Sequence, residues 1–202
     1  MDDFRRWGYL QAKLDPLGQY LQPQIIPELE VTGPIADRAR LLYCGTTGIE
    51  FMHIADGANR HWIEERFERE ESEPDRQHIL DLLVRADLFE QVLQARYAGT
   101  KRFSLEGVTA LVPFLDTLLH SAADRGMRQA VLAMSHRGRL NVMANVIGIV
   151  PAAIFSKFED IDPRSVLGSG DVKYHLGATG QWKDVGGNVI VDLHLVSNPS
   201  HL

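Results

Sequence analysis

The spacing of apolar residues predicts a mainly helical first half of the chain. Short helices are expected at about 4–12 and 35–42, and a charged helix over 59–66 follows Asp56, a residue type that often caps helices. Between the second and third of these helices, residues 49–54 have the character of a short extended run. We therefore expect at least three helices before the chain reaches its more apolar segments.

Two longer apolar patterns come next along the chain. Apolar residues recur at helical spacing over 79–86 and again over 88–93, which predicts a helical hairpin before Gly99. The clearest amphipathic helix spans 106–124, and Gly126 is expected to end it. Its apolar positions recur three or four residues apart and are Val108, Leu111, Val112, Leu115, Leu118, Leu119 and Ala122. These side chains are expected to lie in a core.

The pattern then changes to a continuous apolar run of strand length at 129–134. Such a run is typical of a buried parallel strand. A further helix is predicted over 140–147, and an alternating strand with one mostly polar face over 189–196. The order of helix, strand and helix favours an α/β layer architecture that begins near residues 99–102.

Composition narrows the classes of function. The chain has 45% hydrophobic and 24% charged residues, which is ordinary for a globular protein, and its net charge is −6. This charge gives no long-range attraction to nucleic acid or anionic membranes, so neither is expected as a partner. The single cysteine, Cys44, cannot form an internal disulfide, and no apolar run approaches the roughly 20 residues of a membrane span. A reducing compartment is expected, most simply the cytoplasm.

A polar cluster follows the predicted strand directly, at Ser135-His136-Arg137-Gly138-Arg139. Ligands of open α/β sheets bind at the carboxyl ends of the strands. Two arginines and a histidine at this place can hold a phosphate or a carboxylate, and Gly138 lets the backbone approach closely. The alternative is a solvated turn whose arginines pair with acidic helix residues, and spacing alone does not separate the two.

Two further loops carry candidate chemistry. The glycine-rich segment 168–177 contains Asp, Lys, Tyr and His, and the segment 198–202 follows the last predicted strand. Loops of the first kind often form pockets, because glycine permits unusual backbone angles. A lone histidine such as His175 is nevertheless more often a hydrogen-bonded structural residue, so this loop alone does not define a site.

A zinc site and a nucleotide-hydrolysing P-loop are both disfavoured. The pattern His-Glu-x-x-His is absent, and no carboxylate stands at helical ligand spacing beside His136, His175 or His201. The chain also lacks the sequence Gly-x4-Gly-Lys-Ser/Thr that a P-loop requires. No residue is therefore assigned as a metal ligand.

Seven segments, taken together and in order, resemble the first, decarboxylating component of 2-oxoglutarate dehydrogenase complexes, a thiamine-diphosphate enzyme. They are AKLDPLG at 12–18, YCG at 43–45, FMHI at 51–54, KRFSLEG at 101–107, SHRGRLNV at 135–142, GDVKYHLG at 170–177 and NPSHL at 198–202. Each motif is weak alone, but an unrelated α/β binding domain would not explain the whole ordered set.

The resemblance implies roles for individual residues. His136 and His175 match the histidines that recognise the 2-oxo acid and act in catalysis. Arg137 would contact the diphosphate region of the cofactor, and Ser200 and Leu202 would line the cofactor pocket. Thiamine diphosphate and Mg²⁺ are the implied cofactors, with the metal ligands expected beyond the C-terminus of this chain. We therefore expect the chain to be a fragment that is inactive alone.

The resemblance also implies a domain organisation of class α/β, with a helical N-terminal region followed by the start of a parallel-sheet domain. Proline-rich residues 1–34 are expected to form an arm or docking segment, and 35–100 a helical region. Residues 101–202 would be an incomplete thiamine-diphosphate-binding domain. The implied partners are 2-oxoglutarate, a lipoylated acyltransferase that accepts the succinyl group, and a second copy in a homodimer.

Two alternative functions remain open from the sequence. A relative specific for 2-oxoadipate would differ by one methylene in its substrate, a difference that a pocket separates by only about 1 to 3 kcal/mol. Tyr174 beside His175 favours the shorter acid by resemblance. The chain could instead be a non-catalytic interaction module that docks through residues 1–34.

Overall fold

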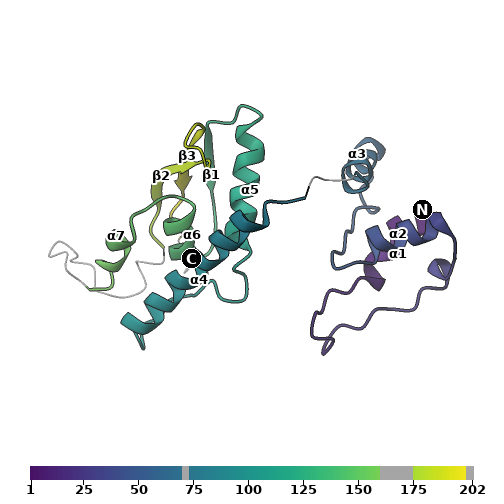
Figure 1. Ribbon diagram of the computed structural model, residues 1–202, viewed down its shortest axis with the longest axis horizontal. Coiled ribbons are helices and arrows are strands. Elements are labelled where there is room, and N and C mark those ends of the chain that lie inside the picture. The colour runs from purple at the N-terminus through teal and green to yellow at the C-terminus, as the bar shows by residue number, and fades with distance from the viewer. Residues whose placement is uncertain (70–72, 160–174, 199–202) are drawn as a thin grey trace. The chain divides into compact units, whose positions relative to one another are not determined.

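The computed structural model describes residues 1–69, 73–159 and 175–198. Contacts divide the chain into two compact units, Met1–Glu73 and Pro74–Leu202 (Figure 1). Each unit has its own cluster of buried apolar side chains, so each can be described by itself.

The described residues of the first unit contain three α-helices, as the sequence predicts. They are α1 (Asp2–Gln11), α2 (Pro34–Tyr43) and α3 (Gly57–Phe67), and a 3₁₀ turn, η1, lies at Pro27–Leu29. The shared core is formed by Phe4, Leu29, Ala36, Ala39, Tyr43, Cys44 and Phe51. This core includes residues from the predicted docking segment, so that segment is partly integrated into the first unit.

The chain between α2 and α3 turns instead of running straight. The predicted extended run over 49–54 is wrong, because the N–H of Ile54 donates to the carbonyl of Phe51 at 3.0 Å and closes a turn. Phe51 is only 2% exposed, and its anchorage in the core forces the chain to reverse there. Asp56 then caps α3 as predicted, since its carboxylate accepts from the N–H groups of Ala58 and Asn59.

Three polar side chains form a cluster in the first unit. The carboxylate of Glu68 accepts from Arg5 Nε at 2.8 Å and from the Tyr43 hydroxyl at 2.6 Å. Burial opposes the charged form of Glu68, but the hydrogen bonds from Arg5 and Tyr43 outweigh it and lower the pKa of this carboxyl. The carboxylate of Glu68, at the end of α3, is therefore hydrogen-bonded to both α1 and α2.

The second unit begins with a single long helix, α4 (Arg76–Arg96), so the predicted helical hairpin is wrong. Its buried positions are Leu82, Ala86, Phe89, Glu90 and Leu93. Each of them lies three or four residues from another, so they share one face, and no glycine or proline interrupts the helix. The two apolar runs of the sequence thus belong to one continuous stripe. This helix belongs to the second core, and the two compact units divide near residue 73.

The next helix, α5 (Leu111–Ala123), begins five residues later than predicted. Gly107 has φ 87°, a left-handed conformation that ends any helix passing through it. Pro113 lies in the first turn of α5, where its missing N–H costs no hydrogen bond. These two residues set the start of the helix, and Gly126, with φ 94°, follows its end as predicted.

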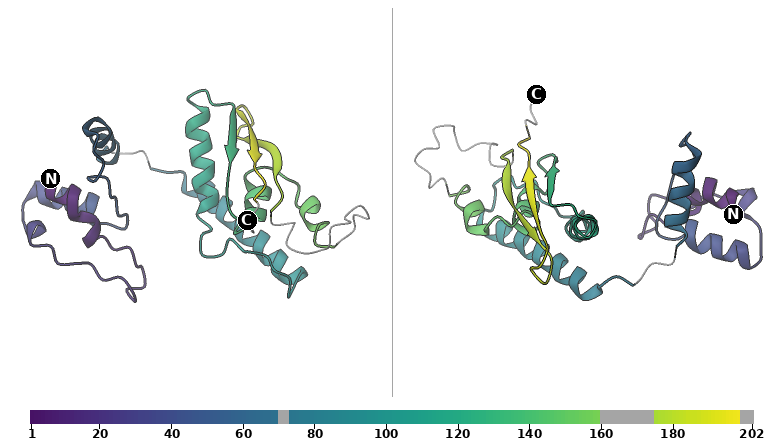
Figure 2. Two further views of the ribbon diagram at one scale, coloured as in Figure 1. Left: turned by 180° about the vertical axis from the view of Figure 1, so that it is seen from behind. Right: turned by 90° about the horizontal axis from the view of Figure 1, so that it is seen from above.

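A three-stranded mixed sheet lies beside these helices in the described part of the second unit (Figure 1, Figure 2). Its order is β1 (Gln129–Leu132), β3 (Ile190–Leu195) and β2 (Ala178–Lys183). The outer strand β1 pairs with β3 in parallel, and β2 pairs with β3 in antiparallel orientation. The predicted strands at 129–134 and 189–196 are thus confirmed, and the α/β class with them.

Two features of the sheet differ from expectation. The strand β1 is not buried on both faces, because it lies at an edge of the described sheet and Val131 is 69% exposed. The strand β2 was not predicted, since Gly180 interrupts its apolar pattern. A Cβ at Gly180 would stand 2.1 Å from the carbonyl oxygen of Ile147. Glycine at this position therefore lets the backbone at Ile147 lie close to β2.

Two further short helices lie in the described part of the second unit. The helix α6 (Arg139–Asn145) matches the predicted helix in part, and α7 (Pro151–Phe155) was not predicted. The buried side chains of α4, α5 and α6 form one core with Trp182 and the inner face of β3. Among the described residues, no helix combines the length and apolar character required to cross a membrane.

Candidate functional site

The first candidate residue, His136, lies just after β1 and packs against an aromatic ring. The centroids of His136 and Phe103 are 4.1 Å apart, at an interplanar angle of 45°. Phe103 has φ 45°, an uncommon left-handed conformation for a residue with a side chain. The segment before α5 therefore supplies an aromatic surface against which the His136 ring packs.

Gly138 brings the turn of His136 onto that segment. Its N–H donates to the carbonyl of Phe103 at 2.7 Å, and its φ is 70°. A Cβ at Gly138 would stand 2.4 Å from Cδ1 of Leu105, so the backbone approaches here as closely as glycine permits. The close approach expected for Gly138 is confirmed, although its neighbour is protein and not a ligand.

The structure brings the second candidate residue, His175, next to the first. The ring centroids of His136 and His175 are 6.1 Å apart, with an interplanar angle of 52°. The N–H of Asn198 donates to the carbonyl of His175 at 2.9 Å, which ties the end of the last strand to the same place. Three of the sequence segments singled out above thus meet at one location.

Two buried polar atoms at this location have no hydrogen-bond partner in the described chain. They are Nδ1 of His136 and Nδ2 of Asn198. Buried polar groups in proteins are almost always satisfied, so atoms of this kind call for an explanation. A ligand that offers hydrogen-bonding groups would supply one.

The two arginines of the cluster behave differently. Arg137 is exposed, and its guanidinium donates to the carbonyl of Ser104 at 3.2 Å. Arg139 is 0% exposed, and burial lowers the pKa of its guanidinium. Its hydrogen bonds go to the backbone carbonyls of Met134, Ser135, Leu176 and Val196. The expectation that both arginines can hold an anion is therefore wrong for Arg139, and of the two only Arg137 is exposed.

The buried carboxylate of Glu90 supports the segment 103–105, against which His136 packs. Oε1 of Glu90 accepts from the N–H of Leu105 at 3.1 Å and from Nδ2 of Asn141 at 2.9 Å. Glu90 is 4% exposed, and its other oxygen, Oε2, is buried without a hydrogen-bond partner among the described residues. Sequence reasoning missed this support, because Glu90 looks like one more charge on a helix.

Part of the predicted site falls outside the described residues. Ser200 and Leu202, expected to line a cofactor pocket, lie there, as does the loop from 168 to Tyr174. Within the described ranges, no group of three or more His, Cys, Asp or Glu side chains could hold a metal ion.

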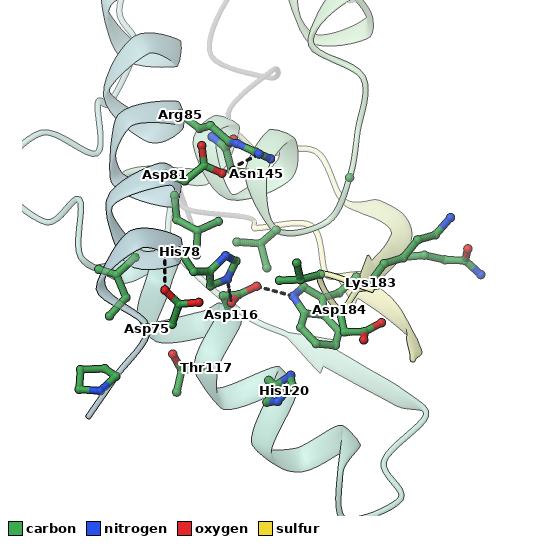
Figure 3. A pocket seen from close by; sticks show the side chains of 18 residues that line it. Asp75, His78, Asp81, Arg85, Asp116, Thr117, His120, Asn145, Lys183 and Asp184 are labelled. Carbon is green, nitrogen blue, oxygen red and sulfur yellow. Dashed lines mark hydrogen bonds and ion pairs between the residues drawn. The ribbon is translucent and has the colours of Figure 1, made fainter. Parts of the chain in front are cut away.

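A separate pocket of about 660 Å³ lies between α4, α5 and β2 (Figure 3). None of the predicted site residues that the structure describes lines it. On its wall, Asp116 accepts from Trp182 Nε1 at 2.8 Å and contacts His78 Nε2 at 2.7 Å. No sequence pattern pointed to this group, because its members lie on three elements far apart in the chain.

Comparison with known proteins identifies relatives of the chain. A scan against models of protein families finds no match. The chain is 43% identical over 79% of its length to the "Multifunctional 2-oxoglutarate metabolism enzyme" of Mycolicibacterium vanbaalenii, of which it covers 13%. It is 39% identical over 98% of its length to the "2-oxoglutarate dehydrogenase E1 component" of Brucella canis and of Brucella suis, of which it covers 23%.

The match extends over nearly the whole chain, although the chain spans less than a quarter of the length of these curated relatives. It includes both histidine segments, whose rings the structure places side by side. Over the part that it covers, the chain belongs to the family of 2-oxoglutarate dehydrogenase E1 components.

Proposed function

We propose that the full-length gene product catalyses the oxidative decarboxylation of 2-oxoglutarate with thiamine diphosphate and transfers the succinyl group to a lipoylated acyltransferase. The observation that carries the proposal is the pair of imidazole rings 6.1 Å apart, of which His136 has a buried Nδ1 without a partner among the described residues. A dicarboxylic 2-oxo acid needs several hydrogen-bond donors, and two adjacent imidazoles can supply them.

The residues around the pair fit the proposed cofactor. Arg137 is an exposed cation next to His136, and a guanidinium suits a diphosphate because its planar fork can bind two oxygens. Ser200 and Leu202 are proposed to line the same pocket. Thiamine diphosphate supplies a carbanion and an electron sink for loss of carbon dioxide. Mg²⁺ would accompany the diphosphate, with ligands proposed to lie outside this chain.

The chain's own residues would orient the substrate and move protons. His136, fixed on the ring of Phe103, would donate to the oxo or carboxylate group of the acid. His175 would face the same substrate from the opposite loop and could exchange a proton with it, since imidazole changes charge near neutral pH. The fixed orientation of both rings would lower the entropic cost of bringing the reacting groups together.

The test is alanine substitution of each histidine in the full-length gene product. His136→Ala and His175→Ala are expected to lower kcat/KM for 2-oxoglutarate by about 10² to 10⁴-fold, the range typical of lost acid–base groups. His61→Ala is the matched control, because this histidine lies in the first unit and its side chain is 70% exposed. If both site variants stayed as active as His61→Ala, the proposal would be wrong.

The same assay with 2-oxoadipate decides between the two acids. We propose 2-oxoglutarate as the preferred substrate, supported by the names of the relatives. We also propose that the 202-residue chain alone is inactive, that the full-length protein is a homodimer, and that it works in the cytoplasm. Turnover by the purified chain with cofactor and Mg²⁺ would contradict the proposed inactivity of the chain alone.

A docking function of the N-terminal segment is the second candidate. Several apolar side chains in it are exposed on the first unit: Leu14, Leu17, Tyr20, Leu21 and Ile25. Exposed apolar residues that gather in one segment often mark a protein interface. Loss of acyltransferase binding on Leu17→Ser with Tyr20→Ser, at unchanged decarboxylation with an artificial electron acceptor, would support docking. Unchanged binding would exclude it.

A further inference from the structure

The buried guanidinium of Arg139 connects the segments that carry the two histidines. It donates to the carbonyls of Met134 and Ser135 on one side. On the other side, Nη1 donates to the carbonyl of Leu176 at 2.9 Å and to that of Val196 at 2.8 Å. The side chain therefore spans the space between the end of β1 and the two segments opposite it.

The carbonyls that Arg139 binds flank the candidate site residues. Ser135 directly precedes His136, and Leu176 directly follows His175. Val196 lies two positions before Asn198, which in turn donates its N–H to the carbonyl of His175. One side chain thus holds both histidine segments by their main chains, at points next to the rings themselves.

The chemistry of the connection favours arginine. A guanidinium is planar and has five N–H donors in a fixed fork, so it can bind carbonyls on two sides at once. A lysine ammonium is a point charge on a flexible stem and cannot keep the same four directions. Burying a cation is costly, so the hydrogen bonds to these carbonyls must offset the lost hydration.

We propose that Arg139 is a positioning residue that sets the separation and mutual orientation of His136 and His175. The inference rests on the proposed function of the histidine pair. Arg139 has no contact with substrate or cofactor in this role. It acts through the main-chain carbonyls that it binds. Separately, the ring of Phe103 packs against His136, and the N–H of Gly138 donates to the carbonyl of Phe103.

The first test compares Arg139→Lys with Arg137→Lys in the 202-residue chain by NMR. The wild type is expected to show a nuclear Overhauser effect between the rings of His136 and His175, because their centroids are 6.1 Å apart. Arg139→Lys should lose this effect, whereas Arg137→Lys, which changes an exposed residue of the same type two positions away, should keep it. An unchanged effect in Arg139→Lys overturns the proposal.

The second test measures catalysis in the full-length gene product. Displacement of a catalytic group by about 1 Å can cost on the order of 100-fold, so kcat of Arg139→Lys should fall by about that factor. Arg66→Lys, at an exposed position of the first unit, should instead leave kcat unchanged. If Arg139→Lys does not fold, Arg139→Gln replaces it, because glutamine keeps amide donors without a buried charge.

A stability control separates positioning from general weakening. Leu82→Ala removes buried apolar volume from α4, eight residues and about 12 Å along the helix from Glu90, away from the loop under His136. With a loss of Tm matched to that of Arg139→Lys, it should keep the ring contact and kcat. An equal fall of kcat in Leu82→Ala overturns the positioning role. Absence of any 2-oxoglutarate turnover in the wild type would instead refute the proposed function, and the NMR comparison would still decide the role of Arg139.

Discussion

At the scale of single residues, Gly138 is the glycine near the site at which substitution by alanine should lower the stability of the fold most. Gly138→Ala would force a left-handed alanine, at about 1 to 2 kcal/mol, and press its Cβ against Leu105. The collision should add about 1 to 3 kcal/mol. Gly187→Ala is the matched control, since Gly187 has φ 68° and a Cβ added there would meet nothing within 4 Å. Urea unfolding should show a clearly larger loss for Gly138→Ala, and equal losses would contradict the close packing.

A second prediction at this scale concerns acid. The Glu68 carboxyl has a lowered pKa in the folded first unit, because hydrogen bonds from Arg5 and Tyr43 outweigh its burial. The unfolded chain therefore binds this proton at higher pH than the folded chain does. The contribution to stability is fully present above the ordinary Glu pKa of about 4.3 and is lost as pH falls through the lower, folded value.

The measurement is the melting temperature of the chain against pH. The wild type should lose stability below about pH 4.3, and Glu68→Gln should flatten this dependence while lowering stability at neutral pH. Glu65→Gln, at an exposed position in the last turn of α3, is the control. A profile of Glu68→Gln that matches the wild type would rule out this linkage.

Whether the role of a residue could be predicted from the sequence depends on how near its interaction partners lie along the chain. His136, Arg137 and His175 stood out through motifs that resemble a family, and Asp56 through the local chemistry of a helix cap. Arg139 could not be assigned, because its partner Leu176 lies 37 residues away and only the folded chain brings the two together. The contacts of Glu90 with Leu105 and Asn141 could not be predicted for the same reason.

At the scale of elements, the continuity of α4 is open to a direct test. Asp87 is exposed in the middle of this helix, where a hairpin turn was predicted. Asp87→Pro should destabilise the second unit by about 3 kcal/mol or more, because it removes a helical hydrogen bond and clashes with the preceding turn. Asp87→Ala should be close to neutral or stabilising. Chemical denaturation measures both, and a tolerated proline would indicate a hairpin after all.

Periodicity predicted the existence of most helices but not all of their limits. The start of α5 depends on Gly107 and Pro113, which override an apolar pattern that continues upstream. The strand β2 escaped prediction because its pairing with β3, and not its own composition, makes it a strand. Elements that depend on a distant partner are thus the ones that sequence patterns miss.

At the scale of the whole molecule, α4 has apolar residues on a second face. Its exposed apolar side chains recur every four residues and are Leu80, Val84, Leu88 and Val92. An exposed stripe of this kind favours association with another apolar surface. We expect the purified 202-residue chain to self-associate at high concentration in sedimentation velocity. Leu80→Glu with Leu88→Glu should shift it toward the monomer, whereas unchanged sedimentation would exclude this face.

The division into two units could not be derived from composition. Each unit is defined by which helices share a core, and α4 resembles the helices before it in sequence while its buried residues belong with the sheet. The α/β class followed from the order of a helix, an apolar strand and another helix, because that order is local. The edge position of β1 depends instead on which strands pair, and strand pairing is a property of the complete fold.

The contact between Arg139 and Val196 also bears on how the protein is made. The two residues are 57 positions apart, and β1 pairs with the strand that carries Val196's neighbours. At ribosomal speeds of about 5 to 20 residues per second, roughly 3 to 11 s separate the synthesis of the two partners. During that interval β1 lacks its β3 neighbour, and the arginine lacks the carbonyl of Val196. A strand edge without its partner is a template for wrong pairing, so we expect slow codons between these positions to lengthen the time for which nascent chains are exposed to it.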